Sequence, residues 1–304
     1  MTEQKPNPNL NPNPVVVGVG YEPCDAALAY AATEVVRAGC GLHVVHVVHV
    51  VATGPEMPLV DAADVERIGR QTLRGALERV RLLLPEDTVV TGEVVHGASV
   101  PGIVSAAAAA DARMIVLQRR VLSRIMRVVT RSVSSGVAAR SKVAVVSVPS
   151  SWTGAVERAE GPVTVGVDDP HRARPVLAAA LEAARSRGAV LRVLHTWWYP
   201  GVYDDIVTRR TEDDEFAERA RSEIQAVLDG LDTTGVEVRI DARHAWPADA
   251  LVAASHDSAL LVVGRHDPLV PFGSHLGPVA RAVLHEAACP VELVNPGQPE
   301  KISA

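Results

Sequence analysis

The chain has 304 residues, which is enough for two domains of ordinary size. Hydrophobic residues make up 47% of it and aromatic residues only 3%, so the core must consist of small aliphatic side chains. Such a composition is typical of parallel strands that are buried under helices on both faces. The formal net charge of -6 argues against a general nucleic-acid binder or membrane-surface binder.

The first 13 residues are rich in Asn and Pro and lack the apolar segment of a signal peptide. They bury too little surface to offset their ordering entropy, so residues 1–13 are expected to form a disordered tail. The apolar run 42–52 is interrupted by His and is too short to span a bilayer. Three scattered cysteines fit neither a disulfide framework nor a zinc site. The sequence therefore predicts a soluble, cytoplasmic protein without a metal site.

The chain contains an internal repeat. The matched segments are Pro14–Gly20 with Pro162–Asp168, Leu42–His46 with Leu191–His195, His96–Gly97 with His244–Ala245, and Met114–Leu117 with Leu260–Val263. The repeat predicts a first copy over residues 14–149 and a second copy over residues 162–296. A polar linker, 150–161, joins the copies, and a second tail covers 297–304.

In the first copy, short apolar runs alternate with Ala-rich stretches. In chain order the pattern predicts the strand Val15–Val19, the helix Ala26–Arg37, the strand Val44–Val51, the helix Ile103–Ala110 and the strand Val143–Val148. Continuous rather than alternating apolarity is what a strand covered on both faces requires. Alanine favours helix formation and lets a helix pack closely on a sheet.

The second copy repeats this order, and its first helix is predicted over Val176–Arg187. Thr211 is followed by three acidic residues, which predicts the capped start of a helix that runs to about Leu228. Alternating strands and helices predict the α/β class, with a doubly wound parallel sheet in each copy. Ligands on such sheets bind at the carboxyl ends of the strands, so the residues that follow the strands are the functional candidates.

A glycine-containing loop follows the apolar run that ends at Val263. It begins with Gly264 and continues to Asp267; nine residues later come Gly277 and Pro278. This spacing resembles the G-x-x-G-x(9)-G-[S/T] signature of the universal stress protein family, whose members often bind ATP. The segments Val165–Asp168, Leu194–His195 and Cys289–Val291 are also similar to that family.

The resemblance covers both copies and implies two tandem Rossmann-like, adenine nucleotide alpha hydrolase-like domains. It also implies a nucleotide site in the second copy, formed by Asp168, Thr196, Gly264, Asp267, Gly277 and Pro278.

Two of these residues depart from the signature. Asp267 replaces a glycine and would place a carboxylate beside a phosphate. Two negative charges about 4 Å apart repel by roughly 4 kcal/mol at an effective dielectric constant near 20. Pro278 lacks both a hydroxyl and a backbone N–H. We therefore expect a triphosphate to fit poorly in the second copy.

The first copy departs further from the signature. Its matching spacing runs from Gln118 through Val121 to Arg131 and Ser132, without any of the glycines. Gly20 replaces the first-strand aspartate. The resemblance therefore implies that the nucleotide site of the first copy is lost.

Four arginines follow the first copy's fourth strand at the spacing of one helix face: Arg120, Arg124, Arg127 and Arg131. One interpretation is a docking stripe for an acidic protein partner or a small anion. The other interpretation is a solvated face that balances acidic residues elsewhere. Both interpretations stay open at this point.

Histidines and aromatic residues suggest two further sites. On a strand, His43 and His49 share one face while His46 points to the other, so the three do not predict a metal site. Aromatic residues gather after the second copy's second strand: Trp197, Trp198, Tyr199 and Tyr203. They fit either a lid beside the ligand or a local hydrophobic plug.

The sequence contains no G-x-S-x-G motif and no fixed triad spacing, so we do not expect an enzyme. The resemblance implies a tandem universal stress protein with a regulatory role. One alternative is an ATP/ADP switch or slow ATPase that acts through the second copy, holding ATP or AMP. Another is an interaction module that uses the arginine stripe. The family also implies pairing of the last strands, Val143–Val148 with Pro290–Val294, as an intramolecular pseudo-dimer, to which a homodimer of whole chains could be added.

Overall fold

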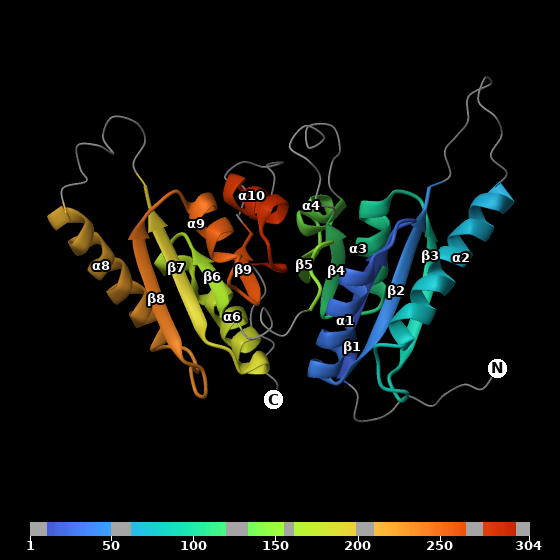
Figure 1. Ribbon diagram of the computed structural model, residues 1–304, viewed down its shortest axis with the longest axis horizontal. Coiled ribbons are helices and arrows are strands. Elements are labelled where there is room, and N and C mark those ends of the chain that lie inside the picture. Colours follow the sequence, from blue (N-terminus) through green and yellow to red (C-terminus); the bar gives the residue numbers. More distant parts are fainter. Residues whose placement is uncertain are drawn as a thin grey trace, which may run out of the picture. The chain divides into compact units, whose positions relative to one another are not determined.

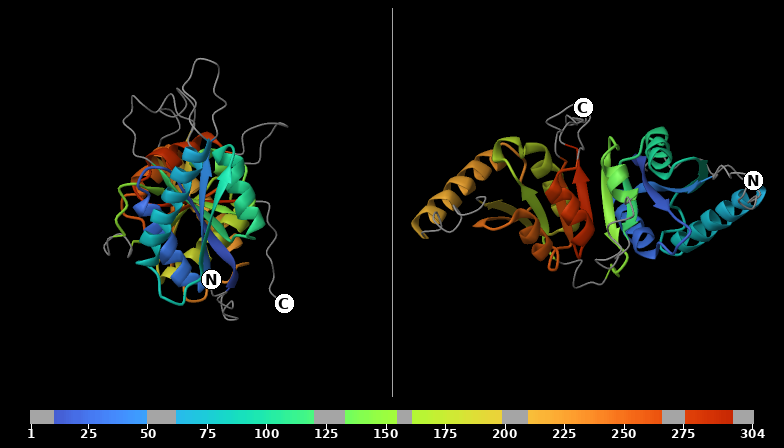
Figure 2. Two further views of the ribbon diagram at one scale, coloured as in Figure 1. Left: turned by 90° about the vertical axis from the view of Figure 1, so that its right-hand side faces the viewer. Right: turned by 90° about the horizontal axis from the view of Figure 1, so that it is seen from above.

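The computed structural model describes residues 11–49, 62–119, 133–154, 161–198, 210–265 and 276–295 (Figure 1). The chain divides into two compact units, Met1–Gly154 (unit 1) and Ala155–Ala304 (unit 2). Within the described residues, each unit is a parallel sheet with helices on both faces (Figure 2). The predicted α/β class with two doubly wound sheets is confirmed.

Unit 1 contains one copy of the repeat. Its elements are β1 (Asn11–Val19), α1 (Asp25–Ala38), β2 (Cys40–Val48), α2 (Ala62–Arg81), β3 (Val90–His96), α3 (Ser99–Ala109), β4 (Met114–Arg119), α4 (Val133–Ala138) and β5 (Ala144–Pro149). The strands lie in the order β3-β2-β1-β4-β5. Helices α1 and α2 pack together on one face, and α3 and α4 pack together on the other.

Unit 2 has the same plan. Its elements are β6 (Val163–Val167), the 3-10 helix η2 (Pro170–Arg172), α6 (Arg174–Arg187), β7 (Leu191–Trp197), α8 (Arg210–Leu228), β8 (Val238–His244), α9 (Pro247–Ala254), β9 (Leu260–Gly264), α10 (Pro278–Glu286) and β10 (Val291–Val294). The strands lie in the order β10-β9-β6-β7-β8. Helices α6 and α8 cover one face, and α9 and α10 cover the other.

The two cores are built from the same positions of the repeat. Valines on the three central strands of each unit are fully buried and pair in the same register: Val17, Val44 and Val116 in unit 1, and Val165, Val193 and Val262 in unit 2. Strands buried on both faces need apolar residues at successive positions, which explains the continuous runs in the sequence.

The first helix of each unit also ends in the same way. Gly39 follows α1 with a φ of 59°, and Gly188 follows α6 with a φ of 60°. This left-handed conformation favours glycine, because a Cβ would be strained there. The paired glycines therefore fix where each helix stops and the next strand begins.

Four predicted boundaries need correction. α3 begins at Ser99 rather than Ile103. β1 begins at Asn11, inside the predicted tail, because its backbone pairs with Cys40 on β2 across a register shift. β2 begins at Cys40 rather than Val44, since Cys40 and Leu42 are already buried. α8 begins at Arg210, so Thr211 lies inside the helix and not before it.

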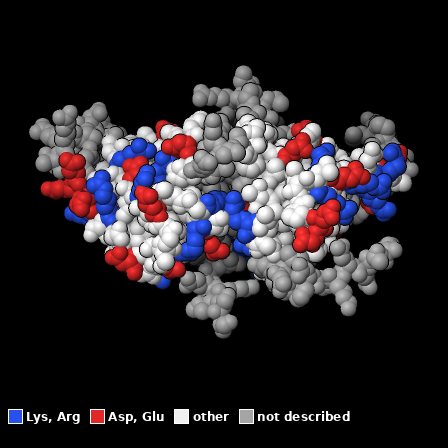
Figure 3. Space-filling view, turned by 60° about the horizontal axis from the view of Figure 1, so that its bottom comes forward, with Lys and Arg blue, Asp and Glu red and all other residues white. Residues whose placement is uncertain are grey.

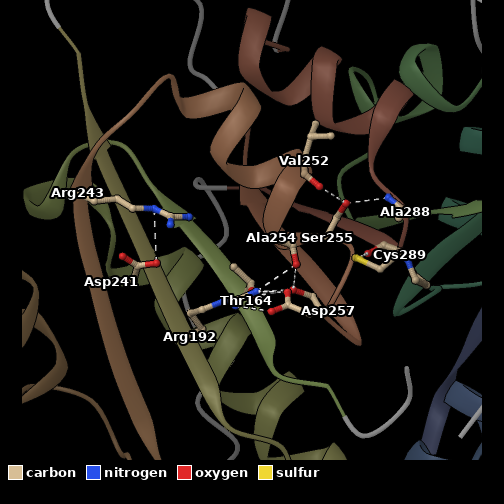
Figure 4. Close-up of polar contacts among 12 residues, drawn as sticks. Thr164, Arg192, Asp241, Arg243, Val252, Ala254, Ser255, Asp257, Ala288 and Cys289 are labelled. Carbon is tan, nitrogen blue, oxygen red and sulfur yellow. Dashed lines mark hydrogen bonds and ion pairs between the residues drawn. The ribbon is translucent and has the colours of Figure 1, made fainter. Parts of the chain in front are cut away.

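A polar network ties together the amino end of the unit 2 sheet (Figure 4). Arg192 on β7 donates to Thr164 on β6 at 2.9 Å and to both carboxylate oxygens of Asp257 at 3.0 and 2.7 Å. The same guanidinium donates to the carbonyl of Ala254 at 3.1 Å and to the hydroxyl of Ser258 at 3.0 Å. The network joins two strands to the end of α9 and satisfies polar groups that burial would otherwise penalise.

Charged side chains of both signs lie beside one another on the face shown in Figure 3. On α2, Arg67 pairs with Asp64 and Arg70 pairs with Glu66. Exposed pairs of this kind each contribute about 0–1 kcal/mol to stability. Among the described residues, no helix has the length and apolarity needed to cross a membrane.

Candidate functional site

A cavity of about 340 Å³ opens in unit 2 at the carboxyl end of its sheet. The strand β6 lies there between β7 and β9, at the point where the chain connections change direction. Such a switch point is the usual ligand site of an open α/β sheet. The volume falls in the range of small-molecule sites, roughly 300–1,000 Å³.

Most of the predicted nucleotide residues lie around this cavity. Its walls include Asp168, Thr196, Gly264, Gly277 and Pro278. They come from the ends of β6, β7 and β9 and from the start of α10. Asp267, the remaining predicted residue, lies outside the described residues. The structure thus brings together residues that are more than a hundred positions apart in the chain.

A histidine fixes the end of the strand that leads to Thr196. The ring Nδ1 of His195 lies 2.9 Å from the carbonyl oxygen of Val167 and donates to it, because a carbonyl only accepts. The pairing of β6 with β7 stops at these two residues, so Thr196 lies just beyond the end of β6. In unit 1, His46 makes the same contact with Val19 at 3.0 Å. Both histidines therefore act as strand-end anchors.

Two neighbouring carboxylates at the rim have different surroundings. Asp169 accepts a hydrogen bond from the backbone N–H of His171 at 2.9 Å and so caps η2. In the described part of the chain, the Asp168 carboxylate makes no hydrogen bond or ion pair. It is therefore the carboxylate that can accept hydrogen bonds from a ligand without first breaking one.

Gly264 leaves space at the end of β9. A Cβ added there would meet only the Cβ of Val176, at 4.0 Å. Arg265 follows, is 8% exposed, and lines the cavity. Burial lowers the pKa of its guanidinium, although arginine stays protonated at neutral pH in proteins. Sequence reasoning missed Arg265, whose only signal was its place directly after a strand-end glycine.

The first turn of α10 forms another part of the cavity wall. Gly277 is the residue before the helix and Pro278 is its first residue. Val279 and Ala280 follow and also line the cavity. Backbone N–H groups in the first turn of a helix have no partner within the helix and favour negative charge. Pro278 has no N–H, so this turn offers fewer donors than a helix start usually does.

The matching place in unit 1 is crossed by a side chain. The Oε1 atom of Gln118, on β4, accepts from the backbone N–H of Ala27 at 3.3 Å. Its Nε2 atom donates to the carbonyl of Pro23 at 2.8 Å. Gln118 thereby links the end of β4 to the connection between β1 and α1. Gly20 stands there in place of the unit 2 aspartate.

The aromatic cluster has two parts. Trp197 packs against buried alanines beside Phe216, with ring centroids 6.4 Å apart, as a hydrophobic plug would. Trp198 stacks on Trp246, with ring centroids 3.7 Å apart and planes at 30°. Thr196 and Pro247, which neighbour this aromatic segment and Trp246 in the sequence, line the cavity, but neither Trp198 nor Trp246 does.

The remaining residues singled out in the sequence either lie outside the described residues or do not come together in one site. Arg120, Arg124, Arg127, Arg131, Tyr199 and Tyr203 lie outside the described residues. His43 contacts Thr91 and Glu93 on β3, while His49 contacts the carbonyl of Gly97. Among the described residues, no group of three or more His, Cys, Asp or Glu residues could hold a metal ion.

The described cavity walls are suited to binding. Apolar side chains from both sheet and helices form most of the surface, among them Val176, Leu194 and Leu251. Carboxylates, guanidiniums and the Thr196 hydroxyl supply a few polar groups. Such a mixture of apolar walls with few polar groups is typical of sites for small organic ligands.

Comparisons with known proteins agree with this architecture. The model of the Universal stress protein family matches residues 12–149 and 161–295. Universal stress protein Rv2005c of Mycobacterium tuberculosis is 32% identical over 289 residues, which cover 91% of this chain and 95% of that protein. Universal stress protein Rv1996 of the same organism is 28% identical over 305 residues, covering 91% and 93%.

A solved structure shows the same fold. The crystal structure of a universal stress protein from Archaeoglobus fulgidus DSM 4304 matches with a TM-score of 0.67 at 17% identity. The match covers 94% of this chain and 97% of that one. Two family modules, each matched separately, account for both repeats. The chain therefore belongs to the universal stress protein family, as a tandem member.

Proposed function

We propose that this tandem universal stress protein binds an adenine nucleotide in unit 2 alone and that occupancy of this single site serves a regulatory stress response. The observation that carries the proposal is the difference between the two switch points. In unit 1, the Gln118 side chain extends over the switch point and bonds to the connection between β1 and α1. In unit 2, Gly264 occupies the matching position and leaves this space open. Among the described residues, the open switch point of unit 2 therefore supports a ligand site there and not in unit 1.

Each part of the unit 2 cavity has a role in this proposal. A flat base would lie against apolar side chains such as Leu194 and Leu251, with the Thr196 backbone at its edge. The Asp168 carboxylate would accept hydrogen bonds from amino or hydroxyl groups of the nucleoside. Arg265 and the start of α10 would face the phosphate.

The proposal requires that a nucleotide binds, and it does not depend on hydrolysis of that nucleotide. The described walls of the cavity contain the Asp168 and Asp169 carboxylates and the Thr196 hydroxyl, but no Ser, Cys, His or Lys. The intramolecular pairing of the last strands, over Val143–Val148 and Pro290–Val294, remains part of the proposal through the family resemblance. A single chain would then contain both modules of the functional unit.

Calorimetry with adenine nucleotides tests the proposal, together with the variant Gly264→Gln. This substitution gives unit 2 the side chain that unit 1 has at the matching position. It should fold, because the position lies in a strand with open space around it, and it should weaken binding at least about tenfold. Gly75→Gln on α2, where a Cβ meets no heavy atom within 4 Å, is the matched control.

Wild-type protein and Gly75→Gln should each bind about one nucleotide per chain. The proposal fails if no adenine nucleotide binds, if two bind per chain, or if Gly264→Gln binds as tightly as the wild-type protein. Circular dichroism of each variant shows whether a loss of binding reflects a loss of fold.

A further inference from the structure

We propose that the unit 2 site selects an adenine nucleoside with at most one phosphate over ATP, and that Pro278 sets this selectivity. The inference rests on the proposed function, because it concerns which nucleotide the same cavity holds. Three features of the described residues support it: the backbone donors, the balance of charge, and the position of the apolar surface.

The start of α10 offers few donors to a chain of phosphates. Pro278 has neither an N–H nor a hydroxyl, and Gly277 has no side chain. The N–H groups of Gly277, Val279 and Ala280 remain at this helix start, and all three residues line the cavity. Pro278 interrupts this row, which leaves two neighbouring donors for the oxygens of one phosphate group, whereas three linked groups require a longer unbroken row of donors.

The charges around the cavity also favour a ligand with few phosphates. Its walls carry the carboxylates of Asp168 and Asp169 and the guanidiniums of Arg172 and Arg265. The formal charges of these four groups sum to zero, so the described walls have no net positive charge to offset several phosphates. Each additional phosphate adds negative charge without adding a cation from the described walls, and it does so near two carboxylates.

Most of the contact surface serves the nucleoside part of the ligand. Leu194, Leu251 and Pro247 line the cavity from β7 and α9. Apolar contact with these residues would be retained by adenosine, AMP and ATP alike. Among the described walls, the phosphates can therefore improve or weaken binding only through α10 and the charged groups.

Titration calorimetry with adenosine, AMP, ADP and magnesium-ATP tests the inference on the full chain. Wild-type protein should bind AMP at least about tenfold more tightly than ATP. Pro278→Ser restores the N–H and the hydroxyl, and should reduce the ratio of AMP affinity to ATP affinity by about tenfold. Pro278→Ala restores the N–H alone, so its affinity ratio should lie between those of wild-type protein and Pro278→Ser. Pro175→Ser, near the start of α6 and outside the cavity, is the matched control.

The outcomes separate this inference from the proposed function. If none of the four ligands binds to any variant, the proposed function fails. If wild-type protein binds ATP as tightly as AMP, the selectivity fails while the proposed function stands. If AMP is preferred equally by wild-type protein and Pro278→Ser, then Pro278 does not set the selectivity. Circular dichroism identifies any variant that has not folded.

Discussion

Single residues decide whether each switch point is open or closed. Gln118 in unit 1 and Gly264 in unit 2 occupy matching positions of the repeat, and they differ by a whole polar side chain. The hydrogen bonds of Gln118 to Ala27 and Pro23 satisfy groups that a ligand would otherwise meet. A polar group that already has a partner gains little from a new one. Under the proposed function, Gln118 makes internal contacts where unit 2 would contact its ligand.

Asp168 and Asp169 allow a test at this scale. Asp168→Ala should weaken nucleotide binding about tenfold or more, because its carboxylate has no other partner in the described residues. The free energy of unfolding should change by less than about 0.5 kcal/mol. Calorimetry measures the affinity, and urea unfolding measures the stability.

Asp169→Ala provides the comparison, because Asp169 caps η2 through the N–H of His171. Loss of this cap should lower the free energy of unfolding by about 0.5–1 kcal/mol, with a smaller effect on affinity than Asp168→Ala. Equal losses of affinity in the two variants would contradict the distinct roles assigned to these carboxylates.

The sequence located the candidate residues of unit 2 better than it described their contacts. Asp168, Thr196 and Gly264 follow strands, and parallel strands end at one edge of the sheet, so their meeting could be predicted. The bonds of Gln118 and the inward position of Arg265 could not, because tertiary contacts direct the side chains at and just after the end of a strand. Whether these residues hold a nucleotide stays a prediction.

At the scale of elements, unit 2 separates its stabilising network from its cavity. Thr164 lies near the start of β6, where Arg192 and Asp257 join the network, whereas Asp168 follows the end of the same strand. The sheet can therefore be anchored at one end while the other keeps polar groups available. Sequence patterns predicted β6 and β7 but not this network, because a partner such as Asp257 lies in a turn far along the chain.

Arg192→Met should lower the free energy of unfolding by about 1–3 kcal/mol, because it removes the hydrogen bonds to Thr164 and Asp257 while retaining an apolar stem. Nucleotide affinity should not change, since Arg192 does not line the cavity. Urea unfolding and calorimetry measure the two quantities. A parallel loss of affinity would show that the two ends of the sheet are coupled.

Acid unfolding gives this variant a second readout. The hydrogen bonds from Arg192 hold the pKa of Asp257 below its usual value. The native state then binds fewer protons than the unfolded state, so this stabilisation is present above the usual Asp pKa of about 3.9 and is lost as the pH falls below it. Arg192→Met should lose less stability than wild-type protein across this range. The difference should stay below about 1 kcal/mol, because Asp257 is largely exposed.

At the scale of the whole molecule, one fold is used twice with different outcomes. The units share strand order, core valines and strand-end histidines, so the repeat preserves the scaffold. They differ at the switch points, where the scaffold does not constrain the side chain. Under the proposed function, duplication lets one module keep a ligand site while the other keeps only its fold.

Amide hydrogen exchange on the full chain tests this asymmetry directly. At AMP concentrations near 100 times the dissociation constant, binding stabilises the occupied unit by about 2.7 kcal/mol, which slows exchange up to about a hundredfold where it requires unfolding of that unit. Protection should increase at the end of β6 and the start of α10, around Asp168 and Val279. The matching segments around Gly20 and Gln118 should show no direct protection, because the Gln118 side chain already occupies that switch point. Equal local protection at both switch points would mean that the first module has retained a ligand site, and the asymmetric assignment would be wrong.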